Sequence, residues 1–225
     1  MSCGGETLSL NKLAFPLVRE LEENAARYGI QVIEAENGAK VIDMGVKAPG
    51  GLEAGLKLIE VCLASLGRAE LSWLPVGDLI LPAVSVRVDR PALATLGAQM
   101  AGWKLELSGQ IVLGSGPARA IVKKPKRIFK ALGHDEGTPS VAILALESDV
   151  LPDELFLTSL ADACGIKPTG LYVLVASLRS PAGIAQVVGR AIESCVLKLL
   201  GSGFDVLAIQ NAMGITLLPP PHPDP

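Results

Sequence analysis

Hydrophobic and polar positions follow two different periods along the chain. Apolar residues recur every three or four positions, as on one face of a helix, over residues 11–27, 52–66, 91–101, 153–164 and 182–200. Shorter stretches alternate or are continuously apolar, as strands are, over residues 30–34, 41–46, 70–73, 79–88, 105–113, 140–146 and 171–176. Because apolar strands and helices follow one another repeatedly, the pattern predicts an α/β fold in which mixed sheets are covered by helices.

One stretch interrupts this alternation and is the best candidate for a boundary between two lobes. Residues Gly133 to Pro139 are polar and contain glycine and proline. The sequence therefore predicts two lobes: an N-terminal α/β lobe over residues 1–133 and a second α/β lobe over residues 140–218, which carries the long helix 182–200. A proline-rich end follows over residues 219–225.

Composition and charge narrow the class of protein. Of the 225 residues 49% are hydrophobic and only 19% are charged, which excludes an intrinsically disordered chain. The net charge of −3 provides no electrostatic footprint for nucleic acid, and we interpret the one basic cluster, residues 123–127, as a solvated patch. No plain apolar run is long enough for a membrane helix and no signal peptide is evident, so we expect a soluble, cytoplasmic protein.

The four cysteines are far apart in the sequence. Cys3, Cys62, Cys164 and Cys195 form no Cys-x-x-Cys pair, and only two histidines accompany them. This spacing indicates reduced, buried thiols rather than a disulfide framework or a zinc site, and Cys62 and Cys195 both have apolar neighbours. We therefore expect no metal site.

The first candidate site is a glycine-rich turn after the strand that ends at Leu113. Gly114, Ser115 and Gly116 allow a sharp turn that exposes amide N–H groups, and Arg119 adds a planar cation, so the segment could hold a phosphate or carboxylate. No Gly-Lys-Ser/Thr follows, which excludes a P-loop. The alternative is an ordinary strand-to-helix turn with Pro117 at the first helical position.

The second candidate lies on the helix expected over residues 182–200. Gln186, Arg190 and Glu193 are spaced by four and three residues and so share one stripe, beside small residues that leave room for a ligand. The opposite face carries five apolar residues and is the expected core face: Ile184, Val188, Ile192, Cys195 and Leu199. The alternative is a solvated surface ion pair between Arg190 and Glu193.

A third candidate is the acidic run that follows the strand 140–146. Glu147 and Asp149 lie where strand carboxyl ends commonly bind ligands. We favour the simpler interpretation that Asp149 or Asp153 caps the next helix.

Seven segments in the same order resemble the methenyltetrahydromethanopterin cyclohydrolases, enzymes of one-carbon metabolism. The resemblance runs from about Leu10 to Asp224. The segments are Glu36-Asn37-Gly38, Gly50-Gly51-Leu52-Glu53-Ala54-Gly55-Leu56, Leu81-Pro82-Ala83-Val84, Gln99-Met100-Ala101-Gly102-Trp103, Gly114-Ser115-Gly116-Pro117-Ala118-Arg119-Ala120, Leu146-Glu147-Ser148-Asp149 and Pro152-Asp153-Glu154.

The resemblance implies a two-lobed α/β protein that assembles as a homotrimer and binds its pterin substrate between the lobes, without a metal or added cofactor. It implies hydrolysis of 5,10-methenyltetrahydromethanopterin to the 5-formyl compound. In this comparison Arg190 and Glu193 match the catalytic pair, with Glu193 deprotonating water and Arg190 aligning it. Gly114, Ser115, Gly116, Arg119 and Gln186 would bind the substrate.

The resemblance also raises a second possibility for the function. Members of the family continue for roughly another third of their length beyond the position that matches Pro225, so the chain is expected to lack the C-terminal third. The alternative to an active cyclohydrolase is a truncated, non-catalytic relative that binds a pterin or serves in assembly.

Overall fold

The computed structural model describes residues 8–221. Cys3 and the last four residues of the expected proline-rich end lie outside this range. The helices and short helical turns are α1 (Leu10–Glu23), α2 (Ala25–Tyr28), α3 (Leu52–Cys62), the π-helix η1 (Ala92–Gln99), α4 (Ala118–Val122), α5 (Lys126–Leu132), α6 (Glu154–Cys164), η2 (Pro168–Gly170), α7 (Pro181–Val188), α8 (Ala191–Gly201) and η3 (Val206–Ala208).

Two sheets organise the fold, as the hydrophobic pattern predicts. The larger has the order β1-β2-β8-β7-β6-β5, with β2, β8 and β7 parallel and the outer strands antiparallel. The smaller is antiparallel, in the order β3-β4-β9. The strands are β1 (Gln31–Glu34), β2 (Lys40–Asp43), β3 (Gly67–Val76), β4 (Leu79–Asp89), β5 (Trp103–Leu107), β6 (Gln110–Ser115), β7 (Ala142–Glu147), β8 (Leu171–Ala176) and β9 (Asn211–Leu217).

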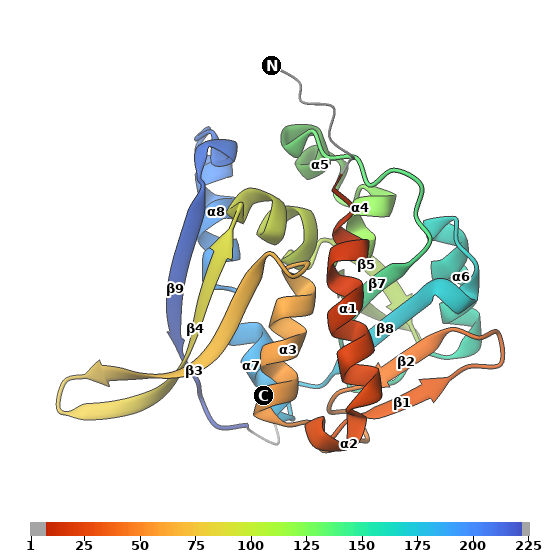
Figure 1. Ribbon diagram of the computed structural model, residues 1–225, viewed down its shortest axis with the longest axis horizontal. Helices are drawn as coiled ribbons and strands as arrows, with labels where there is room; N and C mark the ends of the chain where they lie inside the picture. The colour runs from red at the N-terminus through yellow and green to blue at the C-terminus, as the bar shows by residue number, and fades with distance from the viewer. Residues whose placement is uncertain (1–7, 222–225) are drawn as a thin grey trace.

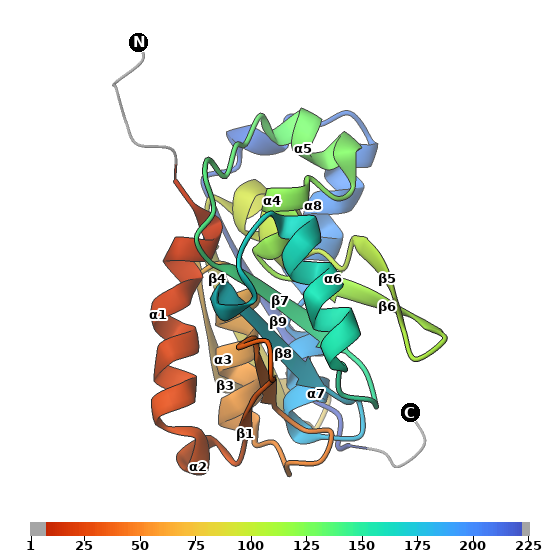
Figure 2. The ribbon, with the colours of Figure 1, turned by 90° about the vertical axis from the view of Figure 1, so that its right-hand side faces the viewer.

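Helices cover both faces of the larger sheet (Figures 1 and 2). On one face α1 and α3 pack on alternate residues of β2, β7 and β8, and on the other α6 packs on the remaining residues. Since β8 is buried on both faces, its sequence is continuously apolar. The opposite side of α3 contacts the smaller sheet, so this helix lies between the two sheets and most of its residues are buried.

The two sheets do not follow the two predicted segments of sequence. The larger sheet pairs β2 with β8, and the smaller pairs β4 with β9, so each combines strands from both sides of residues 133–139. The predicted lobes 1–133 and 140–218 therefore do not each contain a separate sheet. The prediction fails because local sequence signals identify loops but do not indicate which strands pair.

Several predicted elements differ in detail from the observed ones. The strand expected over residues 105–113 is a hairpin of β5 and β6, and the helix expected over residues 91–101 is η1. The helix expected over residues 182–200 is broken into α7 and α8 at Gly189 and Arg190. Strand β9 and helix α5 carry no pattern strong enough to have been predicted, and the sequence indicates α4 only through Pro117.

The start of α1 is fixed by a carboxylate that is distant in sequence. Glu136 is buried and accepts hydrogen bonds from the backbone N–H of Leu10 at 3.1 Å, from that of Asn11 at 2.8 Å and from Nε2 of His134 at 2.9 Å. Burial by itself would raise the pKa of Glu136, but hydrogen bonds from His134 first, and then from Asn11 and Ser9, outweigh it and hold the pKa below its usual range.

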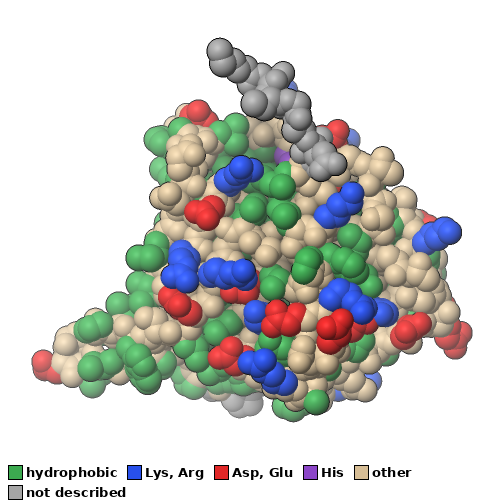
Figure 3. Space-filling model, in the orientation of Figure 1, with side chains coloured by type: hydrophobic (Ala, Val, Ile, Leu, Met, Phe, Trp, Pro, Cys, Tyr) green, Lys and Arg blue, Asp and Glu red, His purple; other side chains and the backbone are tan. Residues whose placement is uncertain are grey.

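The distal part of the β3–β4 hairpin extends from the body and carries apolar side chains on its surface (Figure 3). Trp73, Leu79 and Ile80 are 68%, 61% and 69% exposed, and Met213 on the neighbouring β9 is 78% exposed. Apolar exposure of this extent is typical of a surface that contacts another molecule. Among residues 8–221, none of the helices has the length and apolar character needed to cross a membrane.

Candidate active site

A small cavity of about 230 Å³ opens at the carboxyl ends of β7 and β8, the edge at which α/β sheets commonly bind ligands. Its polar lining comes from Ser115 at the end of β6, Glu147 at the end of β7, Gln186 on α7 and Arg190 between α7 and α8. Ile111 and Leu113 of β6 add apolar side chains. Topology therefore brings residues from three separate predicted motifs to one cavity.

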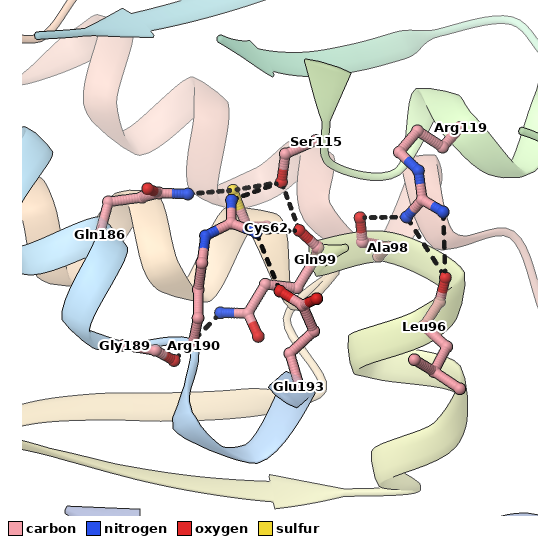
Figure 4. Close-up of polar contacts among 10 residues, drawn as sticks. All are labelled: Cys62, Leu96, Ala98, Gln99, Ser115, Arg119, Gln186, Gly189, Arg190 and Glu193. Carbon is pink, nitrogen blue, oxygen red and sulfur yellow. Dashed lines mark hydrogen bonds and ion pairs between the residues drawn. The ribbon is translucent and has the colours of Figure 1, made fainter. Parts of the chain in front are cut away.

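Arg190 is the centre of the polar contacts at this cavity (Figure 4). Its Nη1 donates to Oε2 of Glu193 at 2.9 Å and to the backbone carbonyl of Gln99 at 2.9 Å, and its Nη2 donates to Oγ of Ser115 at 3.1 Å. The Arg190 and Glu193 side chains are only 16% and 11% exposed. This ion pair is therefore not the solvated surface pair that was the alternative.

The break between α7 and α8 explains why the Arg190 and Glu193 side chains are buried. Arg190 is the residue before the first turn of α8 and Glu193 lies in that turn, so their spacing of three still brings them together. However, the expected core face is only partly buried, since Cys195 and Leu199 are exposed while Gln186 and Glu193 are buried. A straight helix through residues 182–200 would not have this arrangement.

Ser115 connects the glycine-rich turn to the arginine. Its Oγ donates to the backbone carbonyl of Gln99 at 2.5 Å and accepts from Arg190. The Sγ of Cys62 lies 3.7 Å from this Oγ and 4.0 Å from Nε2 of Gln186. Burial raises the pKa of the Cys62 thiol against the opposing effect of Arg190, which keeps it a neutral thiol rather than a nucleophile. Cys62 and Cys164 are buried, as predicted, whereas the same prediction is wrong for Cys195, which is exposed on α8.

The other glycine-turn residues have structural contacts. Gly114 pairs with Leu146 in the sheet, and the N–H of Gly116 donates to the carbonyl of Ala98 at 2.9 Å. Gly116 has φ of +94°, a conformation that favours glycine. The turn leads into α4 directly after Pro117, which agrees with the alternative interpretation of an ordinary strand-to-helix turn.

Arg119 does not reach the cavity. It is fully buried, and its guanidinium donates to the backbone carbonyls of Leu96 at 3.2 Å, Ala98 at 3.1 Å and Lys124 at 2.9 Å. Burial lowers the pKa of Arg119 to about 9, which leaves it protonated at neutral pH. Because these donors are bound to backbone carbonyls, the side chain holds the end of η1 and is not available to an anion. Direct substrate binding was expected of Arg119, and its burial assigns it a structural role instead.

Two residues of the site were not among the sequence candidates. Gln99 contributes the carbonyl that both Arg190 and Ser115 contact, and Cys62 contacts Ser115. A glutamine at the end of an otherwise apolar helix is a signal that could have identified Gln99. No local signal distinguishes Cys62 from a core thiol.

The acidic run has a structural role in part. Asp153 is the N-cap of α6 and accepts from the N–H of Phe156 at 2.8 Å, as the capping interpretation predicts. Asp149 accepts a hydrogen bond from Ser177. Across residues 8–221, no group of three or more His, Cys, Asp or Glu side chains is arranged to hold a metal ion.

Arg190 lines the cavity, whereas Glu193 is not among the lining residues and reaches it only through its contact with Arg190. The fold and site together define an α/β enzyme in which an arginine of the cavity at the carboxyl edge of the sheet holds a carboxylate, an arrangement suited to acid–base chemistry. A family model described as Cyclohydrolase (MCH) matches residues 9–225. The chain therefore belongs to this cyclohydrolase family.

Curated relatives agree with the family model. The chain is 37% identical over 217 residues to the methenyltetrahydromethanopterin cyclohydrolase of Methanospirillum hungatei, a match that covers 96% of this chain and 69% of the relative. It is 38% identical over 216 residues to the protein of the same name from Methanocaldococcus jannaschii, with 95% and 67% covered. The chain thus spans about two thirds of the length of these relatives.

Proposed function

We propose that this protein hydrolyses 5,10-methenyltetrahydromethanopterin to the 5-formyl compound, a step of one-carbon metabolism. The observation that carries the proposal is the buried ion pair of Arg190 and Glu193, 2.9 Å apart, in a chain of the cyclohydrolase family. Arg190 lines the cavity, and Glu193 is held against its guanidinium. The alternative of a non-catalytic pterin-binding relative is disfavoured because this pair is intact and oriented.

The reaction requires an oriented water molecule and a base. The methenyl carbon bridges two nitrogens that share a positive charge, so it is already an electrophile and needs no metal or added cofactor to activate it. Glu193 takes a proton from water as the water oxygen bonds to this carbon, and Arg190 orients the carboxylate. The bond from the carbon to N10 then breaks, N10 takes up one of the two protons of the water, the formyl group stays on N5, and the other proton is released to solvent. The negative carboxylate near the cationic ring also favours its binding.

The cavity fits part of such a substrate. Its volume of about 230 Å³ is below the ~300–1,000 Å³ usual for a complete ligand site. We assign it to the reacting ring, with Ser115 and Gln186 as polar contacts. Gly114 and Gly116 would act indirectly, by holding the turn that presents Ser115. The rest of the substrate would extend over Ile111 and Leu113, which are 77% and 44% exposed.

We further propose that the protein works as a homotrimer in the cytoplasm and does not bind nucleic acid. The exposed apolar surface of the β3–β4 hairpin supports assembly with other copies, and the net charge of −3 supports the absence of nucleic-acid binding. Light scattering at several concentrations measures the mass, and a value of one or two chains would contradict the trimer.

The proposed reaction is tested with the purified chain and 5,10-methenyltetrahydromethanopterin. Turnover is followed as loss of absorbance of the methenyl chromophore, and the 5-formyl product is identified by mass spectrometry. Catalysed loss of the chromophore with formation of this product supports the proposal. Tight binding of the compound without turnover would instead establish the non-catalytic relative.

A further inference from the structure

Gln99 is notable because its backbone carbonyl and its side-chain Nε2 both contact the site, while its side-chain Oε1 has no hydrogen-bond partner among the described residues. It is the last residue of η1 and only 1% exposed. Its backbone carbonyl accepts from Arg190 and from Ser115, and its side-chain Nε2 donates to the backbone carbonyl of Gly189 at 3.2 Å (Figure 4). Gln99 therefore contacts both the guanidinium of Arg190 and the residue immediately before Arg190.

The contact with Gly189 is at the point where the helix breaks. Gly189 ends α7, and Arg190 precedes the first residue of α8. A Cβ at Gly189 would lie 2.6 Å from Cδ1 of Ile59, so α3 already packs closely on this position from another side. The amide of Gln99 supplies a donor to a helix-end carbonyl, a group that requires a partner from outside the helix. The amide thereby fixes where the backbone turns and the direction in which Arg190 leaves it.

The π-helix that carries Gln99 is itself held firmly. Arg119 donates to the carbonyls of Leu96 and Ala98 in the last turn of η1, while Arg190 donates to the carbonyl of Gln99. Two guanidinium groups thus bind the carbonyls of one helix end, where cations are favoured. Gln99 therefore connects this end of η1 to the ion pair of Arg190 and Glu193.

The remaining polar atom of Gln99 argues against a purely packing role. Within the part of the chain that the structure describes, its Oε1 is buried and has no hydrogen-bond partner. Unpaired buried acceptors are rare, and an apolar side chain of the same size would fill this position without one. What an apolar side chain could not supply is the donor to Gly189.

We infer that Gln99 is a positioning residue for the proposed hydrolysis: its amide fixes the α7–α8 break and its carbonyl fixes the guanidinium, so that Arg190 presents the carboxylate of Glu193 in a single orientation. The inference rests on the proposed function only for its kinetic consequence. The geometric consequence, a more mobile Arg190 when the amide is lost, holds whether or not the chain turns over this substrate.

The kinetic test replaces Gln99 with methionine, which preserves length but removes the donor. Gln99→Met is expected to lower kcat by ~10–100-fold with KM within ~3-fold, because a small misplacement of a catalytic group has effects of this size. In a chain that already carries Arg190→Lys, adding Gln99→Met should change kcat by less than ~3-fold, because both changes act through one group. Full additivity of the two effects would overturn the inference.

A matched control separates positioning from general loosening of the helix. Thr95 is also buried on η1 and donates to the carbonyl of Pro91 at 2.7 Å, away from the site. Thr95→Val removes a hydrogen bond from the same helix and is expected to leave kcat within ~3-fold. An equal loss of kcat in Thr95→Val and Gln99→Met would also overturn the inference.

A spectroscopic measurement decides the geometric consequence independently of turnover. The ¹⁵N relaxation of the Arg190 Nε–H group reports how firmly the guanidinium is held, and we expect its order parameter to fall in Gln99→Met but not in Thr95→Val. An unchanged order parameter in Gln99→Met would refute the positioning role, even if the wild-type protein proved inactive and the proposed function failed. If Gln99→Met does not fold, Gln99→Asn, whose amide is one methylene too short to reach Gly189, serves in both measurements.

Discussion

Replacing Glu193 with glutamine separates the chemical role of the carboxylate from its structural one. The change preserves shape but removes the charge that Arg190 contacts at 2.9 Å. Arg190 retains its contacts with the Gln99 carbonyl and Ser115 Oγ, so one of its three hydrogen bonds is weakened. A charge-assisted hydrogen bond contributes ~1.5–3 kcal/mol, which sets the expected loss in free energy of unfolding. For a chain of this length that loss lowers Tm by ~3–12 °C.

The expected loss of activity is larger than the loss of stability. Removal of a general base reduces kcat by ~10²–10⁴-fold, equivalent to ~3–5.5 kcal/mol of activation free energy. The assay follows the methenyl chromophore at a temperature at which differential scanning calorimetry shows Glu193→Gln fully folded. Turnover within ~3-fold of wild type would refute the assignment of Glu193 as the base, whatever the change in Tm.

The matched control is an ion pair of the same spacing on another helix. Arg19 and Glu22 of α1 are also three residues apart, their nearest atoms are 2.7 Å apart, and the Glu22 side chain is 13% exposed, close to the 11% of Glu193. Glu22 also contacts Lys40, so Glu22→Gln should lower Tm as well, but without changing kcat. If both variants lose activity in proportion to their Tm, the loss in Glu193→Gln is structural.

Three further predictions concern stability, each measured by urea unfolding. Arg119→Met should lower the free energy of unfolding by at least ~2 kcal/mol, because it leaves several buried carbonyls without a donor; a neutral result would contradict the structural role of Arg119. The pKa of Glu136 is lowered in the folded state, so ionised Glu136 contributes to the free energy of unfolding above its ordinary pKa of 4.5, and this contribution is lost as the pH falls below that value. Wild type should therefore lose stability more steeply than Glu136→Gln between pH 5 and 3. Parallel curves of stability against pH for the two proteins would exclude this linkage. Gly55→Ala should cost ~1–3 kcal/mol despite a better helix propensity, because its Cβ would lie 2.6 Å from that of Ala185 across the α3–α7 contact; an unchanged midpoint would mean that the two helices separate freely.

Local patterns in the sequence predict those elements whose packing is uniform along their length. Strand β8 occupies residues 171–176, as predicted, because burial on both faces leaves a continuous apolar run. Helix α3 begins at Leu52, as predicted, after a glycine pair. The proximity of Arg190 and Glu193 also follows from their spacing of three, which survives the helix break because both lie at the start of α8.

Long-range contacts determine what the sequence could not predict. The break at Gly189 depends on packing against Ile59 and on the amide of Gln99, neither of which is near it in sequence. The burial of Arg119 likewise depends on carbonyls of η1, so a cation beside a glycine turn was interpreted as an anion contact when it is a structural group. The pairing of strands from the two sides of residues 133–139 is likewise a long-range contact that no local pattern in the sequence indicates.

This strand pairing also determines how the chain can fold during synthesis. Val41 in β2 pairs with Val173 in β8, and Val86 in β4 pairs with Gly214 in β9, so neither sheet closes until late segments have left the ribosome. Contacts between residues so far apart in sequence slow folding, because the entropy of closing a long loop is lost before the contact forms. The apolar faces of the early strands consequently stay uncovered until then, and nascent-chain pulling experiments should detect no force before the segment containing β8 emerges.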